Sequence, residues 1–190
     1  MFTKNKKLFI LLILGLIAVG MAGRLLPHLP NATPITALAF AGSLYFSRYI
    51  SLLLPFGALL LSDLIIGFYN PALMLSVYGS LLFIVLLSWW AQKNRSILGI
   101  GYSVLFSSVI FFLVTNTAVW WFSPWYQKSF AGLLYCFELA LPFLRNMMVG
   151  DFIYTPVLLG ALYAIGNWKN LTAKVELSYK QLTDTKEKTS

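Results

Sequence analysis

The chain has 190 residues, of which 59% are hydrophobic and 11% are charged, and its formal net charge at pH 7 is +8. Soluble domains carry about 25% charged residues, so this composition excludes a soluble globular protein and indicates an integral membrane protein. The excess of Lys and Arg does not indicate nucleic-acid binding, because these residues lie at the ends of apolar stretches and in the C-terminal tail. The chain has one cysteine and one histidine, so we expect no disulfide, no metal site and no cofactor.

Six apolar segments have the character of transmembrane helices. A spanning helix needs about 20 mainly apolar residues, and here prolines, asparagines and charged residues separate such segments. We therefore predict an all-α, polytopic membrane protein with six transmembrane helices, at residues 8–26, 35–46, 50–68, 72–91, 97–115 and 149–167. The six-helix bundle is predicted to take up residues 1–168, and a basic cytoplasmic tail to take up residues 169–190.

Two segments leave alternatives open. Residues 129–144 are apolar enough for a seventh span, but Glu138 lies near their middle and Pro142 near their end. We expect these residues to form an extra helix, which lies in the outer interface or forms a re-entrant hairpin. The first segment follows three lysines and also resembles a signal peptide, whose cleavage would leave five spans.

The basic residues are distributed unequally between the two sides of the predicted bundle. With the N terminus inside, 11 of the 14 Lys and Arg residues are cytoplasmic, and only Arg24, Lys128 and Arg145 lie outside. The positive-inside rule therefore predicts that both termini are cytoplasmic.

The polar residues within the apolar region collect towards the outer side. A charge near the hydrocarbon costs roughly 2.5–3.5 kcal/mol, so such a cluster indicates a binding site for a small-molecule ligand. The candidate substrate-binding residues come from the proline-rich first loop and from the later spans: His28, Asn31, Thr33, Asp63, Asn116, Trp120, Trp121, Arg145, Asn146 and Asp151. The alternative is structural, with the carboxylates paired to Arg24 and Arg145 and the tryptophans in an interfacial belt.

Enzyme motifs are mostly missing from the sequence. It has no Gly-rich loop ending in Gly-Lys, no Gly-x-Ser-x-Gly and no His-Glu-x-x-His. One chemical alternative is an intramembrane aspartyl pair of Asp63 and Asp151, the latter within a Gly-Asp dipeptide. We expect no enzymatic activity.

Several motifs resemble those of a family of small uncharacterised bacterial membrane proteins. The resemblance covers about residues 24–160 and is carried by residues 24–28, 31–35, 61–68, 111–116, 142–146 and 150–151. That family is similar in turn to the substrate-binding (S) components of energy-coupling-factor (ECF) vitamin transporters. Those are six-helix bundles with cytoplasmic termini and a ligand pocket under the outer loops.

This second resemblance implies a function in uptake. The chain would capture a small vitamin-like molecule, and separate ATPase and transmembrane coupling subunits would supply the energy. An Ala-x-x-x-Ala face on the first helix docks the coupling subunit in such transporters, and Ala18 and Ala22 match this pattern. The alternative from another class is a non-transporting membrane protein that scaffolds or assembles a partner complex.

Overall fold

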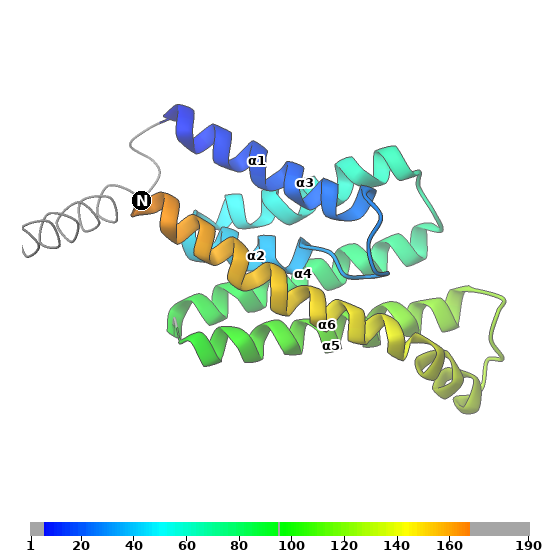
Figure 1. The fold of residues 1–190 in the computed structure, drawn as a ribbon. Coiled ribbons are helices and arrows are strands. Elements are labelled where there is room, and N and C mark those ends of the chain that lie inside the picture. Colours follow the sequence, from blue (N-terminus) through cyan, green and yellow to red (C-terminus); the bar gives the residue numbers. More distant parts are fainter. Residues whose placement is uncertain (1–5, 95, 168–190) are drawn as a thin grey trace, which may run out of the picture.

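The computed structural model describes residues 6–94 and 96–167, and every regular element in these ranges is an α-helix. Figure 1 shows the helices running back and forth between two ends of an elongated bundle. Five of the described helices are long and apolar enough to cross a membrane. The helices are α1 (Lys6–Leu25), α2 (Ile35–Tyr45), α3 (Arg48–Ile66), α4 (Pro71–Asn94), α5 (Ile97–Phe122) and α6 (Phe130–Gly166).

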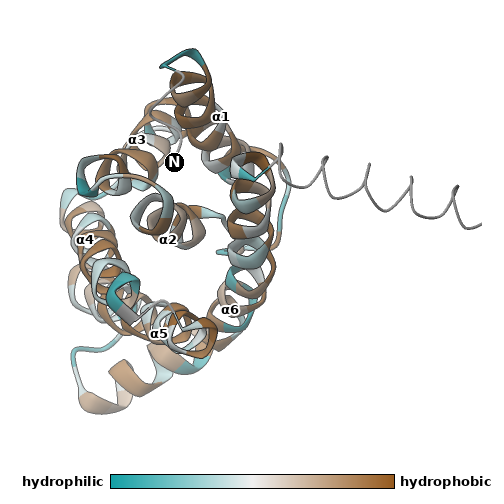
Figure 2. Ribbon diagram, turned by 90° about the vertical axis from the view of Figure 1, so that its left-hand side faces the viewer, coloured by the Kyte–Doolittle hydropathy of each residue, from teal (hydrophilic) through white to brown (hydrophobic). Residues whose placement is uncertain are grey.

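The short helix α2 forms the centre of the bundle. Figure 2 shows it inside a ring of the other five helices, and it contacts each of them. Eight of its 11 residues are buried, including Leu38 and Phe40, which are fully buried. Gly42 allows α3 to approach closely, because a Cβ at this position would lie 2.5 Å from Ser51 Cα. The apolar surface of α2 therefore packs against protein on all sides.

Polar residues at the turns define the helix ends. Asn70 Oδ1 accepts a hydrogen bond from the Ala72 amide at the start of α4 (2.9 Å), and Ser129 Oγ accepts one from the Gly132 amide of α6 (3.1 Å). These are N-cap interactions, which satisfy amides that have no partner within the helix. At the end of α3, Gly67 adopts a φ of 104°, and its amide bonds to Asp63 O (2.8 Å). A left-handed backbone of this kind favours glycine.

Three predictions about the helical segments differ from the structure. Residues 129–144 do not form a separate helix, because residues 130–166 are one helix of 37 residues that continues through Pro142 and Pro156. Figure 1 shows the first turns of α6 at the lower right, where they run at an angle to the rest of the helix and away from the bundle. The predicted second span is also too short to cross by itself, since 11 residues rise only about 16 Å. The predicted fifth span ends seven residues too early, at residue 115 instead of Phe122.

The loops fall into two groups at opposite ends of the bundle. The α1–α2, α3–α4 and α5–α6 loops lie at one end, which we call the distal end. The N-terminal end of α1, the α2–α3 turn and the C-terminal end of α6 lie at the other, the proximal end. The predicted tail, residues 169–190, lies outside the described residues.

Candidate functional site

A cavity of about 350 Å³ lies inside the distal half of the bundle. All six helices and two distal loops contribute to its wall. The polar side chains that line it are Arg24, Asn31, Thr33, Thr36, Tyr69, Thr115 and Asn116. The apolar part of the wall is formed by Ile35, Leu59, Val77, Leu81, Ile84, Phe111, Val119 and Met147. A concave site with an apolar wall and a few polar groups is typical of small-molecule binding.

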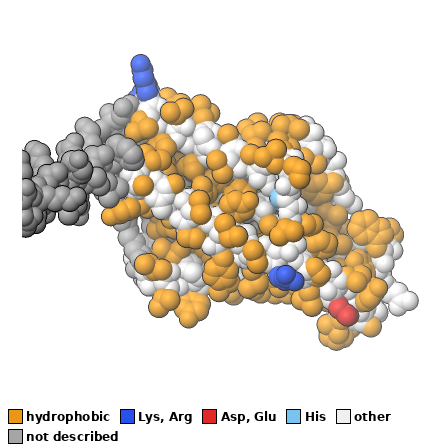
Figure 3. All heavy atoms as spheres, in the orientation of Figure 1, with side chains coloured by type: hydrophobic (Ala, Val, Ile, Leu, Met, Phe, Trp, Pro, Cys, Tyr) orange, Lys and Arg blue, Asp and Glu red, His pale blue; other side chains and the backbone are white. Residues whose placement is uncertain are grey.

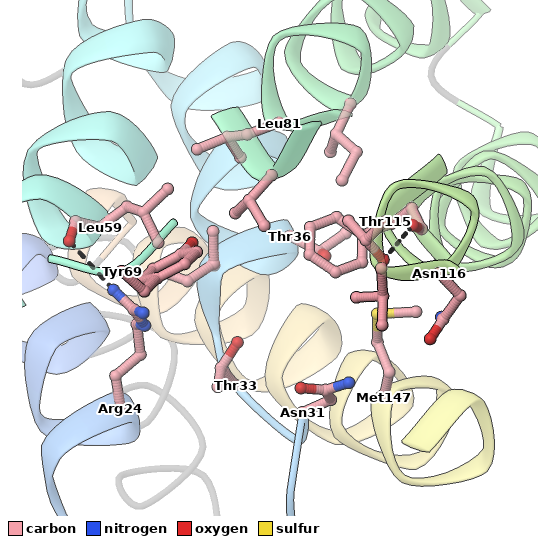
Figure 4. A pocket seen from close by; sticks show the side chains of 15 residues that line it. Arg24, Asn31, Thr33, Thr36, Leu59, Tyr69, Leu81, Thr115, Asn116 and Met147 are labelled. Atoms are coloured by element: carbon pink, nitrogen blue, oxygen red, sulfur yellow. Dashed lines mark hydrogen bonds between the residues drawn. The ribbon is translucent and has the colours of Figure 1, made fainter. Parts of the chain in front are cut away.

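The positive charge at the cavity comes from Arg24, near the end of α1. Its Nη1 lies 2.7 Å from Asp63 Oδ1 and donates hydrogen bonds to Leu59 O (3.0 Å) and Ser62 Oγ. Figure 4 shows the guanidinium group beside the Tyr69 ring. The ion pair holds the guanidinium group at the cavity wall and balances its charge.

Asp63 lies behind this wall and is only 1% exposed. Its second oxygen, Oδ2, accepts a hydrogen bond from the Tyr78 hydroxyl (2.8 Å). Both carboxylate oxygens therefore have partners, as a buried charge requires. Asp63 influences the cavity through Arg24 and does not line it.

Tyr69, in the α3–α4 loop, has a perturbed hydroxyl group. Burial raises the pKa of Tyr69 above its ordinary value of 10.0, and the negative charge of Asp63 raises it further. Arg24 acts in the opposite direction. The Tyr69 hydroxyl therefore remains neutral near pH 7 and can donate a hydrogen bond.

The α1–α2 loop supplies Asn31 and Thr33. Asn31 has a φ of 65°, a left-handed conformation that asparagine tolerates better than most residues. Between them, the buried Ala32 packs on α6 at Gly150, where a Cβ would lie 2.9 Å from Ala32 Cα. The absence of a side chain at Gly150 thus lets the loop lie against α6.

The opposite wall comes from α5 and α6. Figure 4 shows Thr115, Asn116 and Met147 across the cavity from Arg24 and Tyr69. The Asn116 side-chain amide donates to Phe112 O (2.8 Å), and the Thr115 hydroxyl donates to Phe111 O (2.7 Å). These bonds to the preceding turn leave the Asn116 carbonyl oxygen and the Thr115 oxygen lone pairs as acceptors for a ligand.

Three of the ten predicted binding residues line this cavity: Asn31, Thr33 and Asn116. The ion pair of Arg24 and Asp63 that the structural alternative suggested is present. Sequence reasoning missed Thr36, Tyr69, Thr115 and Met147 as lining residues. Thr115 was adjacent to a predicted residue, and Thr36 lies one turn after Thr33, but nothing in the sequence marked Tyr69 or Met147.

The other predicted residues lie elsewhere. His28 is exposed, with Nδ1 2.7 Å from Leu26 O, and Arg145 is also exposed. Asn146 is half-buried and does not line the cavity. Asp151 is buried against Ser108, whose Oγ donates to Asp151 Oδ2 (2.7 Å), at a different cavity.

The predicted tryptophans hold the α5–α6 turn instead of covering the cavity. Trp120 Nε1 donates to Gln127 O (2.8 Å), and the Lys128 ammonium lies 5.9 Å from the centre of the Trp120 ring. The Lys128 ammonium also donates hydrogen bonds to Trp120 O and to Ser123 O (2.6 Å). Trp121 is 58% exposed.

The helix α1 presents two different faces. Leu16 and Gly20 are buried in the bundle, whereas the predicted docking residue Ala18 is exposed and Ala22 is half-buried. Figure 3 shows hydrophobic side chains over much of one face of the molecule, with few charged groups among them. Surfaces of this kind fit lipid or other membrane helices.

These helices and this cavity define the class: a multi-pass, helical membrane protein with a cavity that both polar and apolar side chains line. The chain belongs to a family of unknown function (DUF6580), whose model matches residues 3–174. No curated protein and no solved structure matches the chain.

Proposed function

We propose that the chain is a membrane-embedded substrate-binding subunit for the uptake of a small vitamin-like molecule. The observation that carries this proposal is the cavity at the distal end, which polar side chains from three helices and two loops line. A protein that only spans the membrane has no need of a 350 Å³ cavity with seven polar lining residues among its helices.

Charge supports an orientation with the cavity towards the extracytoplasmic side. Among the described residues, Lys6, Lys7, Arg48 and Lys93 lie at the proximal ends of their helices. The positive-inside rule makes this the cytoplasmic end, so both chain ends are cytoplasmic in a bacterial inner membrane. The distal loops then face the compartment from which a nutrient is captured.

The cavity wall suggests the chemistry of the ligand. The Nη1 atom of Arg24 is already bonded to protein acceptors, but a guanidinium group carries five N–H donors in all. The remaining donors suit a carboxylate or carbonyl oxygen of the ligand, while Phe111, Val119 and Met147 suit an apolar or ring-shaped body. A volume of 350 Å³ suits a small organic molecule.

Energy for uptake would come from separate ATPases and a transmembrane coupling subunit, as in ECF transporters. The exposed Ala18 face of α1 is where we expect that coupling subunit to dock, since small residues let membrane helices approach closely. The competing scaffold hypothesis uses the same face but assigns no ligand to the cavity.

The test is purification of the full chain in mild detergent, followed by mass spectrometry of retained molecules and thermal-shift measurements with a panel of vitamins. A matched pair of variants localises binding: Thr115→Val and Thr117→Val. Both hydroxyls bond to the carbonyl four residues earlier (2.7 Å each), but Thr115 lines the cavity and Thr117 is exposed.

We expect Thr115→Val to weaken binding about tenfold and Thr117→Val to leave it unchanged. If no compound is retained or stabilises the protein, and a partner complex still assembles, the scaffold hypothesis replaces this proposal. Ala18→Leu should abolish that assembly under either hypothesis, because its bulk prevents close helix packing.

A further inference from the structure

A second cavity, of about 260 Å³, lies between the first turns of α5 and the C-terminal half of α6. It shares no lining residue with the distal cavity. Most of its wall is apolar, from residues such as Ile100, Val104 and Leu159. Two polar residues of α6, Asp151 and Thr155, also line it, one turn apart on the same face.

Both polar residues have an oxygen without a partner. Asp151 is 1% exposed and Thr155 is 6% exposed. The Ser108 hydroxyl donates to Asp151 Oδ2 (2.7 Å), but Asp151 Oδ1 and Thr155 Oγ1 have no hydrogen-bond partner. Buried polar atoms are paired in most proteins, so two such atoms in one cavity indicate a ligand.

The Thr155 hydroxyl departs from the pattern of the other helical hydroxyls. Ser107, Thr115 and Thr117 each donate to the carbonyl four residues earlier, which is the usual way to satisfy a hydroxyl in a membrane helix. Thr155 makes no such bond to Asp151 O. Its oxygen is therefore free to act together with Asp151 Oδ1.

A backbone oxygen is also released beside these two. Proline has no amide hydrogen, so Pro156 cannot donate to the carbonyl of Phe152. Phe152 and Pro156 both line the cavity. The cavity wall thus includes a carboxylate residue, a hydroxyl residue and a residue, Phe152, whose backbone carbonyl has lost its usual donor.

No protein cation balances the Asp151 charge within the described residues, where the one ion pair joins Arg24 and Asp63. The helices packed on α6 are α2 and α5, and their only titratable side chains are Tyr45 and Tyr102. On α6 itself, Arg145 and Glu138 are exposed, and the described residues hold no cluster of His, Cys, Asp and Glu for a transition metal.

We propose that the Asp151 cavity binds a monovalent metal cation of the size of Na⁺, with Asp151 Oδ1 and Thr155 Oγ1 as ligands. Alkali and alkaline-earth cations prefer oxygen ligands, as this site offers. A single carboxylate favours a monovalent cation over a divalent one. It neutralises a monovalent cation but leaves a divalent cation with an excess positive charge in a region of low dielectric constant. Further oxygen ligands would have to come from water that enters with the cation.

This site lies 21 residues after the start of α6, whereas the sequence-based prediction placed Asp151 at the start of a span. At 1.5 Å per residue, Asp151 lies roughly 22 Å from the C-terminal end of α6. Thr36 of α2 lies against the Asp151 carboxyl group and also lines the distal cavity. Thr36 would therefore lie between a cation at Asp151 and a ligand in the distal cavity. The proposed cation binding does not depend on the proposed function.

The experiment measures thermal unfolding of the full chain in detergent, with NaCl replaced stepwise by choline chloride at constant ionic strength. We expect saturating Na⁺ to raise the midpoint by about 5 °C or more, since a ligand at 100 times its Kd stabilises substantially. Asp151→Asn should abolish this shift. Thr155→Val should raise the Na⁺ concentration for half the shift about tenfold, and Thr155→Ser should restore it.

Ser107→Ala is the matched control, because Ser107 is a fully buried hydroxyl of α5 that bonds only within its own helix (2.8 Å to Ser103 O). It should leave the Na⁺ dependence unchanged. Equal midpoints in Na⁺ and choline for the wild-type chain would overturn the proposal, as would a midpoint that responds to pH alone. If Asp151→Asn does not fold, the proposal is tested by the comparison of Thr155→Val with Thr155→Ser. Equal Na⁺ dependence in these two variants would overturn it.

Discussion

Arg24 of α1 and Asp63 of α3 form an ion pair, with 2.7 Å between Nη1 and Oδ1, at the distal end of the bundle. Asp63 is almost fully buried and Arg24 is 18% exposed, so water screens the pair only weakly. The pair joins two helices that are not consecutive in the chain and fixes a guanidinium group at the cavity wall. Both the stability of the fold and the shape of the site therefore depend on it.

Removing one partner of this pair should destabilise the protein strongly. Asp63→Asn leaves the Arg24 cation without its counter-charge, and Arg24→Gln leaves the Asp63 carboxylate buried and unpaired. Breaking a buried pair in this way costs about 3–5 kcal/mol. We expect a marked loss of thermal stability in detergent for each single variant. The double variant should lose less stability than the sum of the two single losses.

Arg145→Gln is the control for this experiment. Arg145 is an exposed cation towards the same end of the bundle, so its removal should change the free energy of unfolding by no more than about 0.5 kcal/mol. Additive losses in the Arg24 and Asp63 variants would contradict an energetic coupling between them.

The hydrogen bond from Tyr78 to Asp63 can be tested separately. The Tyr78 hydroxyl lies 2.8 Å from Asp63 Oδ2, and bonds to charged groups contribute about 1.5–3 kcal/mol. Tyr78→Phe should therefore lower the stability by an amount in this range. Tyr102→Phe, at a tyrosine that is 70% exposed, should have almost no effect. Equal stability losses in the two variants would show that the Tyr78 bond contributes nothing.

Hydropathy and charge predict much of this fold. The apolar segments locate five of the helices to within a few residues at most ends. The structural alternative paired the carboxylates with Arg24 and Arg145, and one such pair, Asp63 with Arg24, is present. The proline-rich loop was also expected to supply Asn31 and Thr33 to a site, and both line the distal cavity. These features depend on local composition, which the sequence displays directly.

The rest depends on tertiary packing, which the composition does not display. A membrane helix is apolar towards lipid and towards its neighbours, so hydropathy does not reveal that α2 is central or that Trp120 holds a turn. Pro142 was expected to weaken the last turns of residues 129–144, but prolines are tolerated within membrane helices, and α6 continues through it. For the same reason Asp151 was placed at the start of a span, whereas its helix begins 21 residues earlier.

Tyr69 leads to a prediction about alkaline pH. Burial and the Asp63 charge raise its pKa in the folded state, whereas the unfolded chain titrates near 10.0. The unfolded state therefore loses this proton first, and the stability that Tyr69 contributes is present below pH 10 and is lost as the pH rises through the folded pKa. Spectrophotometric titration of the wild type and Tyr69→Phe should differ by one tyrosine that titrates above 10. A difference that titrates at or below 10 would contradict this environment.

The contact between Gly150 and Ala32 predicts opposite effects for two similar substitutions. A Cβ at Gly150 would lie 2.9 Å from Ala32 Cα, whereas a Cβ at Gly160 on the same helix would meet nothing within 4 Å. Gly160→Ala should therefore stabilise α6 by about 0.5–1 kcal/mol through helix propensity. Gly150→Ala gains the same propensity but displaces the loop, and such overpacking costs about 1–3 kcal/mol.

The displaced loop carries Asn31 and Thr33, so Gly150→Ala should also weaken any ligand bound in the distal cavity. Thermal unfolding in detergent with and without that ligand measures both effects in one experiment. Gly160→Ala should retain the ligand-dependent shift in full, because it lies outside the cavity wall. If both substitutions stabilise the protein, the loop accommodates an added methyl group. If both variants also show equal ligand-dependent shifts, the close packing of the loop on α6 does not position the site.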